Sequence, residues 1–154
     1  MTNMNNLFRE AYKNLEPNKE FMVEILEMLK LDINDRDIYW YYGKQGLGKT
    51  WFVKYLVKVF GAILLGLRGA DNRNAILQYV NTNGYFPDLI LINIGYDKDL
   101  NKVNYSMFEE IKDMCFYSGK YEGGMICGPN PNLIVFANEK PESENEKFII
   151  KKIK

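Results

Sequence analysis

Residues 43–50 constrain the fold of this chain more than any other stretch. They read Gly-Lys-Gln-Gly-Leu-Gly-Lys-Thr and fit the phosphate-binding pattern G-x-x-x-x-G-K-[ST]. Residues 37–42, which precede them, are β-branched and aromatic, as is typical of a strand. Residues 51–60, which follow, have apolar side chains at helical spacing and no helix breaker. The sequence therefore predicts a strand, a phosphate-binding loop and a helix in succession, and a chance glycine-rich turn is the alternative.

Such a loop binds phosphate mainly through its backbone. Glycines let successive N–H groups face one anion, and the following helix presents the positive end of its dipole. Lys49 can then reach the β- and γ-phosphates of a nucleoside triphosphate, and the Thr50 hydroxyl can ligate Mg²⁺. We expect the nucleotide to be bound by Gly43, Gln45, Gly46, Leu47, Gly48, Lys49, Thr50 and Trp51.

Composition excludes several other kinds of site. The chain has 154 residues and no histidine, which excludes a Ser-His-Asp triad and a histidine-based zinc site. Basic and acidic residues number 20 each, so a strongly basic coat for duplex DNA is missing. No apolar run approaches the ~18 residues of a transmembrane helix, so we expect no membrane association and an intracellular location. Cys115 and Cys127 fit a reducing compartment, and we expect both to be buried free thiols.

Strand-like and helix-like stretches alternate along the rest of the chain, which predicts an α/β sandwich. We expect one domain over 34–154, preceded by a short N-terminal helical segment over 1–33. Apolar residues at helical spacing predict two helices in that segment, which serve either as an oligomerisation collar or as packing for the core. Asp71 is the expected cap of a later helix. The expected strands are 62–65, 89–92 and 133–137, and the expected helices are 7–15, 21–31, 71–79 and 105–115, with a hairpin around Gly119, Gly123 and Gly124.

The strand expected at 89–92 ends in Asn93, where a phosphate-loop ATPase usually has an acidic residue. That carboxylate orients Mg²⁺ or helps to polarise the attacking water. An amide carries no charge, so it is a poor anchor for a divalent cation and a poor base. Asp97 and Asp99 follow in an expected loop, either as a substitute acid or, as we favour, as solvated loop carboxylates.

Three later stretches resemble one protein family. Residues 104–112 read NYSMFEEIK, residues 116–124 read FYSGKYEGG, and residues 131–141 read PNLIVFANEKP. Together with the loop and its preceding strand, they resemble the superfamily 3 helicase domain of replication-initiator (Rep) proteins. These proteins belong to circular single-stranded DNA viruses and their satellite and plasmid relatives. The resemblance covers about residues 35–141, and the Ser-Gly-Lys-Tyr hairpin ahead of a strand ending Ala-Asn-x-x-Pro is more specific than the loop alone.

The resemblance implies a three-layer, AAA+-like phosphate-loop NTPase fold and an ATP-dependent DNA helicase of rolling-circle replication. Such a protein hydrolyses ATP with Mg²⁺ and moves single-stranded DNA through a ring, for which six subunits are the family expectation, and it acts in the host nucleus if it is viral. Asn138 matches the sensor that positions the attacking water, and Lys120 and Tyr121 match the DNA-contacting hairpin. Lys147 is the expected stand-in for a basic residue that acts across the subunit interface. We expect Lys112 to be an ordinary surface lysine.

The chain departs from the family pattern at two positions and lacks one family feature. Asn93 stands where the family has its Walker B aspartate, and Lys147 stands where an arginine is usual. The histidine-containing nicking site is absent from this chain, so no nicking is expected. Two alternatives stay open: a DNA-associated module that binds ATP but hydrolyses it weakly or not at all, and a small phosphate-loop kinase. A kinase needs an arginine-rich lid, whereas the arginines here are scattered at Arg9, Arg36, Arg68 and Arg73.

Overall fold

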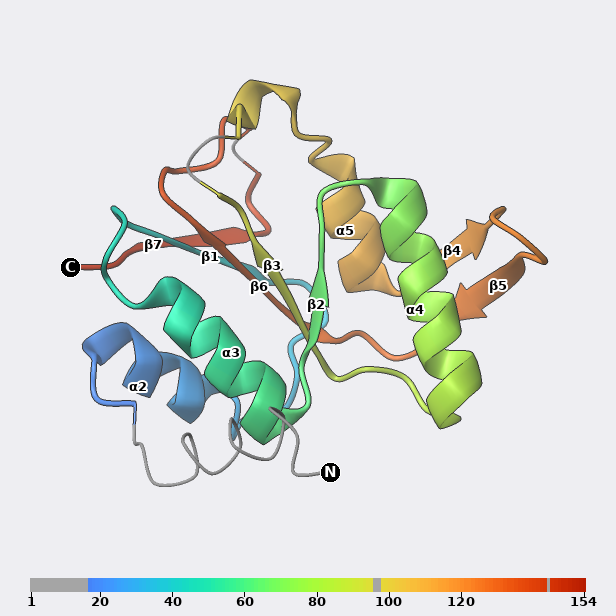
Figure 1. Cartoon of the computed structure of the whole chain (residues 1–154), viewed down its shortest axis with the longest axis horizontal. Helices are drawn as coiled ribbons and strands as arrows, with labels where there is room; N and C mark the ends of the chain where they lie inside the picture. Colours follow the sequence, from blue (N-terminus) through green and yellow to red (C-terminus); the bar gives the residue numbers. More distant parts are fainter. Residues whose placement is uncertain (1–16, 96–97, 144) are drawn as a thin grey trace, which may run out of the picture.

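The computed structural model describes residues 17–95, 98–143 and 145–154, and it confirms the α/β class. Five parallel strands form a sheet with helices on both faces, and a separate two-stranded hairpin projects from one side (Figure 1). The sheet strands are β1 (Ile38–Tyr42), β2 (Ile63–Leu65), β3 (Leu89–Asn93), β6 (Asn132–Ala137) and β7 (Phe148–Lys152), and the hairpin strands are β4 (Cys115–Ser118) and β5 (Gly124–Cys127). The helices are α2 (Glu20–Met28), α3 (Lys49–Phe60), α4 (Gly69–Asn83) and α5 (Ser106–Asp113), with a short 3-10 turn, η1 (Leu100–Lys102).

The order of the strands in the sheet brings three strand ends together. The order is β2-β3-β6-β1-β7, so β6 lies between β1 and β3. Backbone hydrogen bonds continue past the strand ends, from Gly43 N to Ala137 O (3.1 Å) and from Ile94 N to Phe136 O (2.8 Å). Ligands of open parallel sheets bind outside the carboxyl ends of the strands. The 43–50 loop begins there, directly after the carboxyl end of β1.

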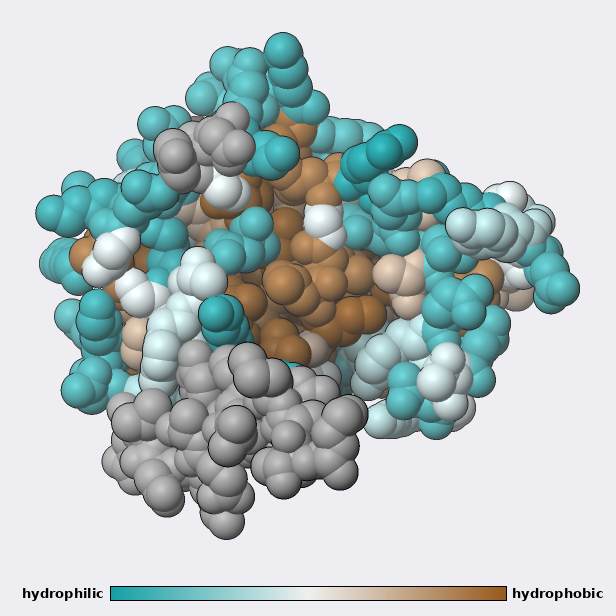
Figure 2. Space-filling model, viewed as in Figure 1, coloured by the Kyte–Doolittle hydropathy of each residue, from teal (hydrophilic) through white to brown (hydrophobic). Residues whose placement is uncertain are grey.

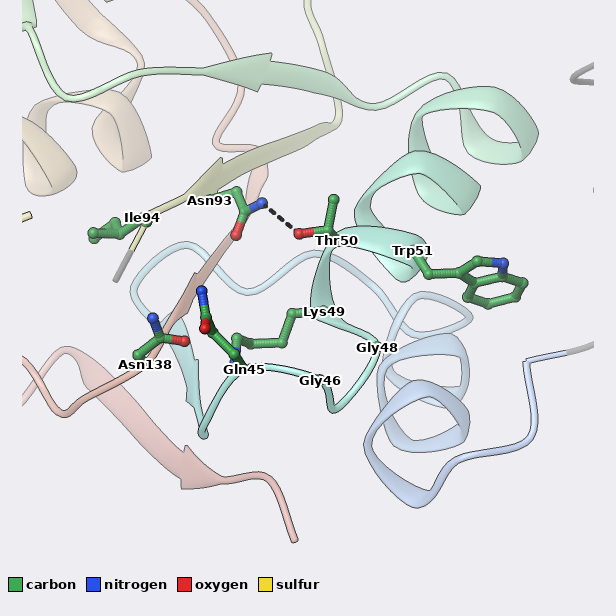
Figure 3. Close-up of a pocket in the computed structure, with 10 residues that line it drawn as sticks. Gln45, Gly46, Gly48, Lys49, Thr50, Trp51, Asn93, Ile94 and Asn138 are labelled. Carbon is green, nitrogen blue, oxygen red and sulfur yellow. Dashed lines mark hydrogen bonds between the residues drawn. The ribbon is translucent and has the colours of Figure 1, made fainter. Parts of the chain in front are cut away.

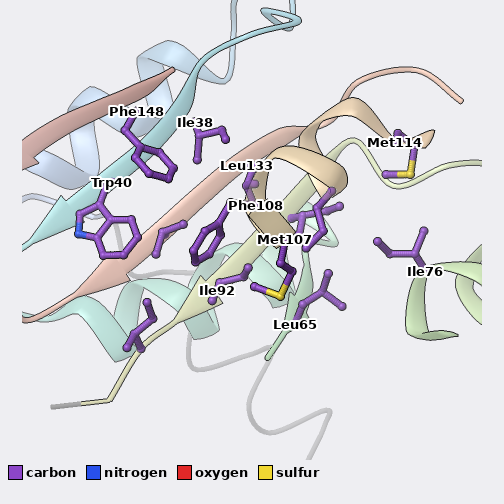
Figure 4. Close-up of a cluster of buried hydrophobic side chains, with 14 of the residues drawn as sticks. Ile38, Trp40, Leu65, Ile76, Ile92, Met107, Phe108, Met114, Leu133 and Phe148 are labelled. Atoms are coloured by element: carbon purple, nitrogen blue, oxygen red, sulfur yellow. The ribbon is translucent and has the colours of Figure 1, made fainter. Parts of the chain in front are cut away.

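The central strands β3 and β6 are buried on both faces, which explains their nearly continuous apolar runs. In β6, Leu133 and Val135 face α4 and α5, whereas Ile134 and Phe136 face α2 and α3. Figure 4 shows the first of these two clusters, where Trp40 meets Phe108 edge-on at 5.7 Å between ring centres. One cluster fills each face of the sheet, so the sheet lies as the middle layer between two layers of helices.

Two elements differ from the sequence expectation. Helix α4 begins at Gly69, its cap position is Arg68, and no side chain caps it, so the predicted cap Asp71 lies inside the first turn. The charged tail forms strand β7, which the sequence did not predict, and it pairs in parallel with β1 at one edge of the sheet. The other edge is β2, where Figure 2 shows apolar side chains gathered near the centre of the visible face and where Leu64 is half exposed.

Three side chains lie in environments that differ from the sequence expectation. Cys115 and Cys127 are exposed rather than buried, because β4 and β5 turn Phe116, Ser118 and Ile126 inward instead. Lys112 is not a surface lysine, since only 1% of it is exposed. Its ammonium donates to the backbone carbonyls of Asn34 and Pro131, and burial lowers the pKa of Lys112 to about 8.

The N-terminal segment is described only in part. The helix expected at 7–15 lies outside the described residues. Helix α2 buries Phe21, Met22 and Ile25 in the same cluster as α3, so this apolar stripe packs on the core. The collar proposed for 1–33 therefore stays a prediction. No helix within the described ranges combines the length and the apolarity needed to cross a membrane.

Candidate functional site

The 43–50 loop connects β1 to α3, as the motif predicts (Figure 3). Gly46 and Gly48 have φ angles of 86° and 94°, in the left-handed region that glycine adopts without strain. A Cβ at Gly48 would also lie 3.0 Å from the Met22 Cε, whereas nothing lies within 4 Å of a Cβ at Gly46. No side chain caps the start of α3, so its first N–H groups remain available to an anion.

A cavity of about 480 Å³ opens over this loop. Of the predicted nucleotide-binding residues, all but Gly43 and Leu47 line it; these two pack on each other, since a Cβ at Gly43 would lie 2.7 Å from Leu47 Cδ1. Asn93 and Asn138 reach the cavity from the ends of β3 and β6. The full lining is Gln45, Gly46, Gly48, Lys49, Thr50, Trp51, Asn93, Ile94, Gly95 and Asn138.

Lys49 supplies the only charge among the described lining residues. Its side chain is buried, and its ammonium donates to Gly43 O and, at 2.8 Å, to Lys44 O. Burial lowers the pKa of Lys49 below its usual value. A cavity with one ammonium, several backbone N–H groups and no carboxylate in its described lining is suited to an anion.

Thr50 and Asn93 lie next to each other, although 43 residues separate them in the chain. The Asn93 amide nitrogen donates to the Thr50 hydroxyl at 3.4 Å (Figure 3). The position predicted for a Walker B acid is therefore beside the loop threonine, but it carries an amide. Asp99 does not line the cavity, because it caps η1 by accepting from Asn101 N, and Asp97 lies outside the described residues. The described residues contain no cluster of three or more His, Cys, Asp or Glu that could hold a metal ion.

Lys147 does not share this cavity. It directly precedes β7, and its carbonyl accepts from Ile38 N at the amino ends of the strands, opposite the edge where the loop lies. Its ammonium pairs with Glu109 of α5 at 3.1 Å. A role in the site of its own chain is therefore excluded, and its role across a subunit interface stays a prediction.

Lys120 and Tyr121 lie in the turn of the β4–β5 hairpin, which projects on the α4 side of the molecule (Figure 1). Tyr121 is 87% exposed. The Lys120 ammonium pairs with Asp71 on α4, and this hydrogen bond holds the pKa of the Asp71 carboxyl below its usual value. Tyr117 and Met125 face each other across the hairpin, and both are exposed. Neither was predicted as a site residue, although alternation within the two strands was the available signal.

Comparison with known proteins adds a relationship to this geometry. The Para-Rep C1 protein of Faba bean necrotic yellows C1 alphasatellite is 31% identical over 120 residues, which cover 75% of this chain and 40% of that protein. The chain is similar to viral and satellite replication proteins. The master replication protein of Faba bean necrotic yellows virus (isolate Syrian SV292-88) is 30% identical over 126 residues, or 81% of this chain and 41% of that protein. The Para-Rep C2 protein of Subterranean clover stunt C2 alphasatellite is 30% identical over 129 residues, with 80% and 42% covered.

The chain thus spans about two fifths of the length of the curated relatives that it matches. No family model matches it.

Proposed function

We propose that this chain is the ATP-binding domain of a Rep-type replication protein and works as a DNA-stimulated ATPase. The observation that carries the proposal is the cavity in which Lys49, Thr50, Asn93 and Asn138 meet, at the carboxyl edge of a parallel sheet. The similarity to replication proteins supports the same conclusion. The fold is then a phosphate-loop NTPase of the superfamily 3 helicase type.

Each lining residue has a role that its chemistry supports. The N–H groups of the loop and of the start of α3 cradle the phosphates, and Lys49 exchanges its loop carbonyls for phosphate oxygens. The Thr50 hydroxyl is the protein ligand for Mg²⁺, which suits a cation that keeps its waters and relies on substrate phosphates rather than on a protein cage. When bound there, Mg²⁺ would supply positive charge that offsets the charge developing on the phosphates. Asn138 positions the attacking water with its amide.

DNA is handled at the hairpin and not in the cavity. Tyr121 offers an exposed ring for base stacking, and Lys120 offers a cation for a backbone phosphate. We propose that subunits assemble into a ring, that hydrolysis shifts the hairpin, and that this moves single-stranded DNA through the centre. Lys147 then acts on a neighbour's nucleotide, and the protein works in the nucleus of an infected host during rolling-circle replication.

A second candidate function rests on Asn93. Because no described residue of the cavity lining carries a carboxylate, the site favours binding over hydrolysis. The chain would then be a nucleotide-binding module that assembles on DNA and turns over slowly. A kinase is less well supported, since the described arginines are engaged outside the cavity, in the pairs Arg36–Glu146, Arg68–Asp71 and Arg73–Glu110.

Steady-state ATPase measurements with and without single-stranded DNA separate these functions. The helicase proposal predicts turnover that DNA stimulates and that Lys49→Met abolishes. Turnover that stays at background while Mg-ATP still binds would favour the module. Absence of nucleotide binding by folded protein would contradict both functions.

A further inference from the structure

The two cysteines of the chain lie opposite each other at the base of the β4–β5 hairpin. Cys115 and Cys127 are register partners in the antiparallel pair, and their sulfur atoms are 4.0 Å apart. Both side chains are exposed to solvent. They are also the only cysteines in the sequence, so each has a single possible partner within its chain.

The backbone places this pair at the kind of position where strands approach most closely. Gly128 N donates to Met114 O at 3.0 Å, which is the bond that flanks a non-hydrogen-bonded pair. Cα atoms at such positions are ~4.5 Å apart, close to the lower end of the range that disulfides span. A disulfide therefore needs rotation of the side chains and little movement of the backbone.

The residues next to the cysteines hold this geometry in place. Met114 is fully buried at the end of α5, with a left-handed φ of 50°. Gly128 lies under Phe86, since a Cβ there would come within 2.4 Å of the Phe86 ring. The base of the hairpin is thus anchored on both strands, while the thiols themselves point outward.

We propose that Cys115 and Cys127 are a modification site, at which a small-molecule disulfide such as oxidised glutathione forms a reversible cross-strand disulfide. One thiol loses its proton and attacks the oxidant, which gives a mixed disulfide and one reduced glutathione. The second thiolate attacks the protein sulfur of that mixed disulfide and releases the second glutathione. The chain loses two protons and two electrons, which together are two hydrogen atoms, and the two glutathione molecules take them up as they become thiols.

The disulfide closes the base of the surface that carries Tyr117, Lys120 and Tyr121. Cross-linking restricts the hairpin and lowers the ordering cost of any ligand that binds its fixed form. For single-stranded DNA this consequence rests on the proposed function, whereas the disulfide itself does not. Exposed disulfides are readily reduced. The fraction of the chain that carries this disulfide therefore depends on the balance of oxidised and reduced thiols around the protein.

Peptide mapping by mass spectrometry tests the disulfide directly. After treatment with oxidised glutathione, the proposal predicts that the intact mass falls by two hydrogens, that one cross-linked peptide joins Cys115 to Cys127, and that hairpin amide exchange slows by ~10-fold or more. Dithiothreitol reverses all three changes. The matched variant Cys127→Ser takes up one glutathione and keeps its original exchange rate. Glutathione on both wild-type cysteines, covalent dimers, or two unchanged thiols would overturn the proposal.

Binding of a fluorescent oligothymidine tests the consequence for DNA. We expect the oxidised wild type to bind ~3-fold or more tightly than the reduced form, and the treated Cys127→Ser variant to show no such gain. Equal affinities would overturn the regulatory consequence. Failure of both forms to bind DNA would count against the proposed function, while the mass measurement would still decide whether the disulfide forms.

Discussion

Replacing Asn93 by aspartate tests how the site handles charge. The Thr50 hydroxyl accepts a hydrogen bond from the Asn93 amide nitrogen at 3.4 Å. The substitution keeps the shape of the side chain and places one negative charge beside that hydroxyl. Because Lys49 is the only charged side chain in the described lining, the new carboxylate acts on a site that otherwise has no anion.

The expected effect has opposite signs with and without Mg²⁺. Unit charges ~4 Å apart interact by ~1 kcal/mol in water and ~4 kcal/mol at the effective dielectric constant of ~20 that is typical near a protein surface. Asn93 is exposed to water, so the lower value sets the minimum effect. A divalent cation then gains ~2 kcal/mol and the phosphates lose ~1 kcal/mol, so Mg-ATP gains ~1 kcal/mol net, or ~5-fold in affinity, while ATP without metal loses ~1 kcal/mol, or ~5-fold.

Isothermal titration of both variants with ATP, once in Mg²⁺ and once in EDTA, measures these changes. Asn81→Asp is the matched control, because Asn81 is an exposed residue of α4 and the substitution makes the same change of net charge. The DNA-stimulated ATPase rate of Asn93→Asp should also rise. Equal shifts in the two buffers, or no shift in either, would refute the argument that position 93 lies next to the metal.

Three further predictions concern the hairpin, the cavity rim and the core. Lys120→Ala should weaken binding to single-stranded DNA while Mg-ATP affinity persists. Asp71→Asn should strengthen DNA binding ~2- to 5-fold, because it releases Lys120 from a surface ion pair. Fluorescence anisotropy with labelled DNA measures both effects, and affinities equal to that of the wild type would contradict the role of the turn. Mg-ATP should change the fluorescence of Trp51, which lines the cavity, and not that of the fully buried Trp40. The Trp51→Phe variant should therefore lose the fluorescence change, whereas the Trp40→Phe variant should keep it. Burial lowers the pKa of Lys112 from 10.5 to about 8, so the unfolded chain binds more protons than the folded chain between these pH values. The free energy of unfolding should therefore rise with pH in that window, by at most ~3 kcal/mol relative to Lys112→Met. Urea unfolding of both proteins at pH 7.5 and pH 10 measures this difference, and the same pH dependence in both proteins would contradict it.

Apolar runs predicted the central strands well, because these strands are buried on both faces. Strands β3 and β6 are of this kind, and their positions were predicted to within a residue. Strand β7 was missed because it lies at the edge of the sheet, and only its first half is apolar while Lys151 and Lys152 are exposed. Lys112 follows Phe108 by one helical turn and thus shares its buried face, which spacing alone could have indicated.

The loop motif predicted the lining of the site better than it predicted the partners of the lining residues. Its spacing identified Lys49 and Thr50, but the contact between Thr50 and Asn93 depends on the order of the strands, which no local pattern states. Ile94 and Gly95 complete the cavity for the same reason. The exposure of the cysteines could not be read from their type, because small sulfur side chains are usually buried.

Calorimetric titration of Mg-ATP into the folded protein tests the central claim most directly. The account predicts saturable binding at one site per chain, and at least ~100-fold weaker binding by Lys49→Met, which removes the only charge among the described lining residues. Circular dichroism confirms that both proteins are folded. No binding by the folded wild type, or equal affinity in the two proteins, would contradict a phosphate-binding role for the 43–50 loop.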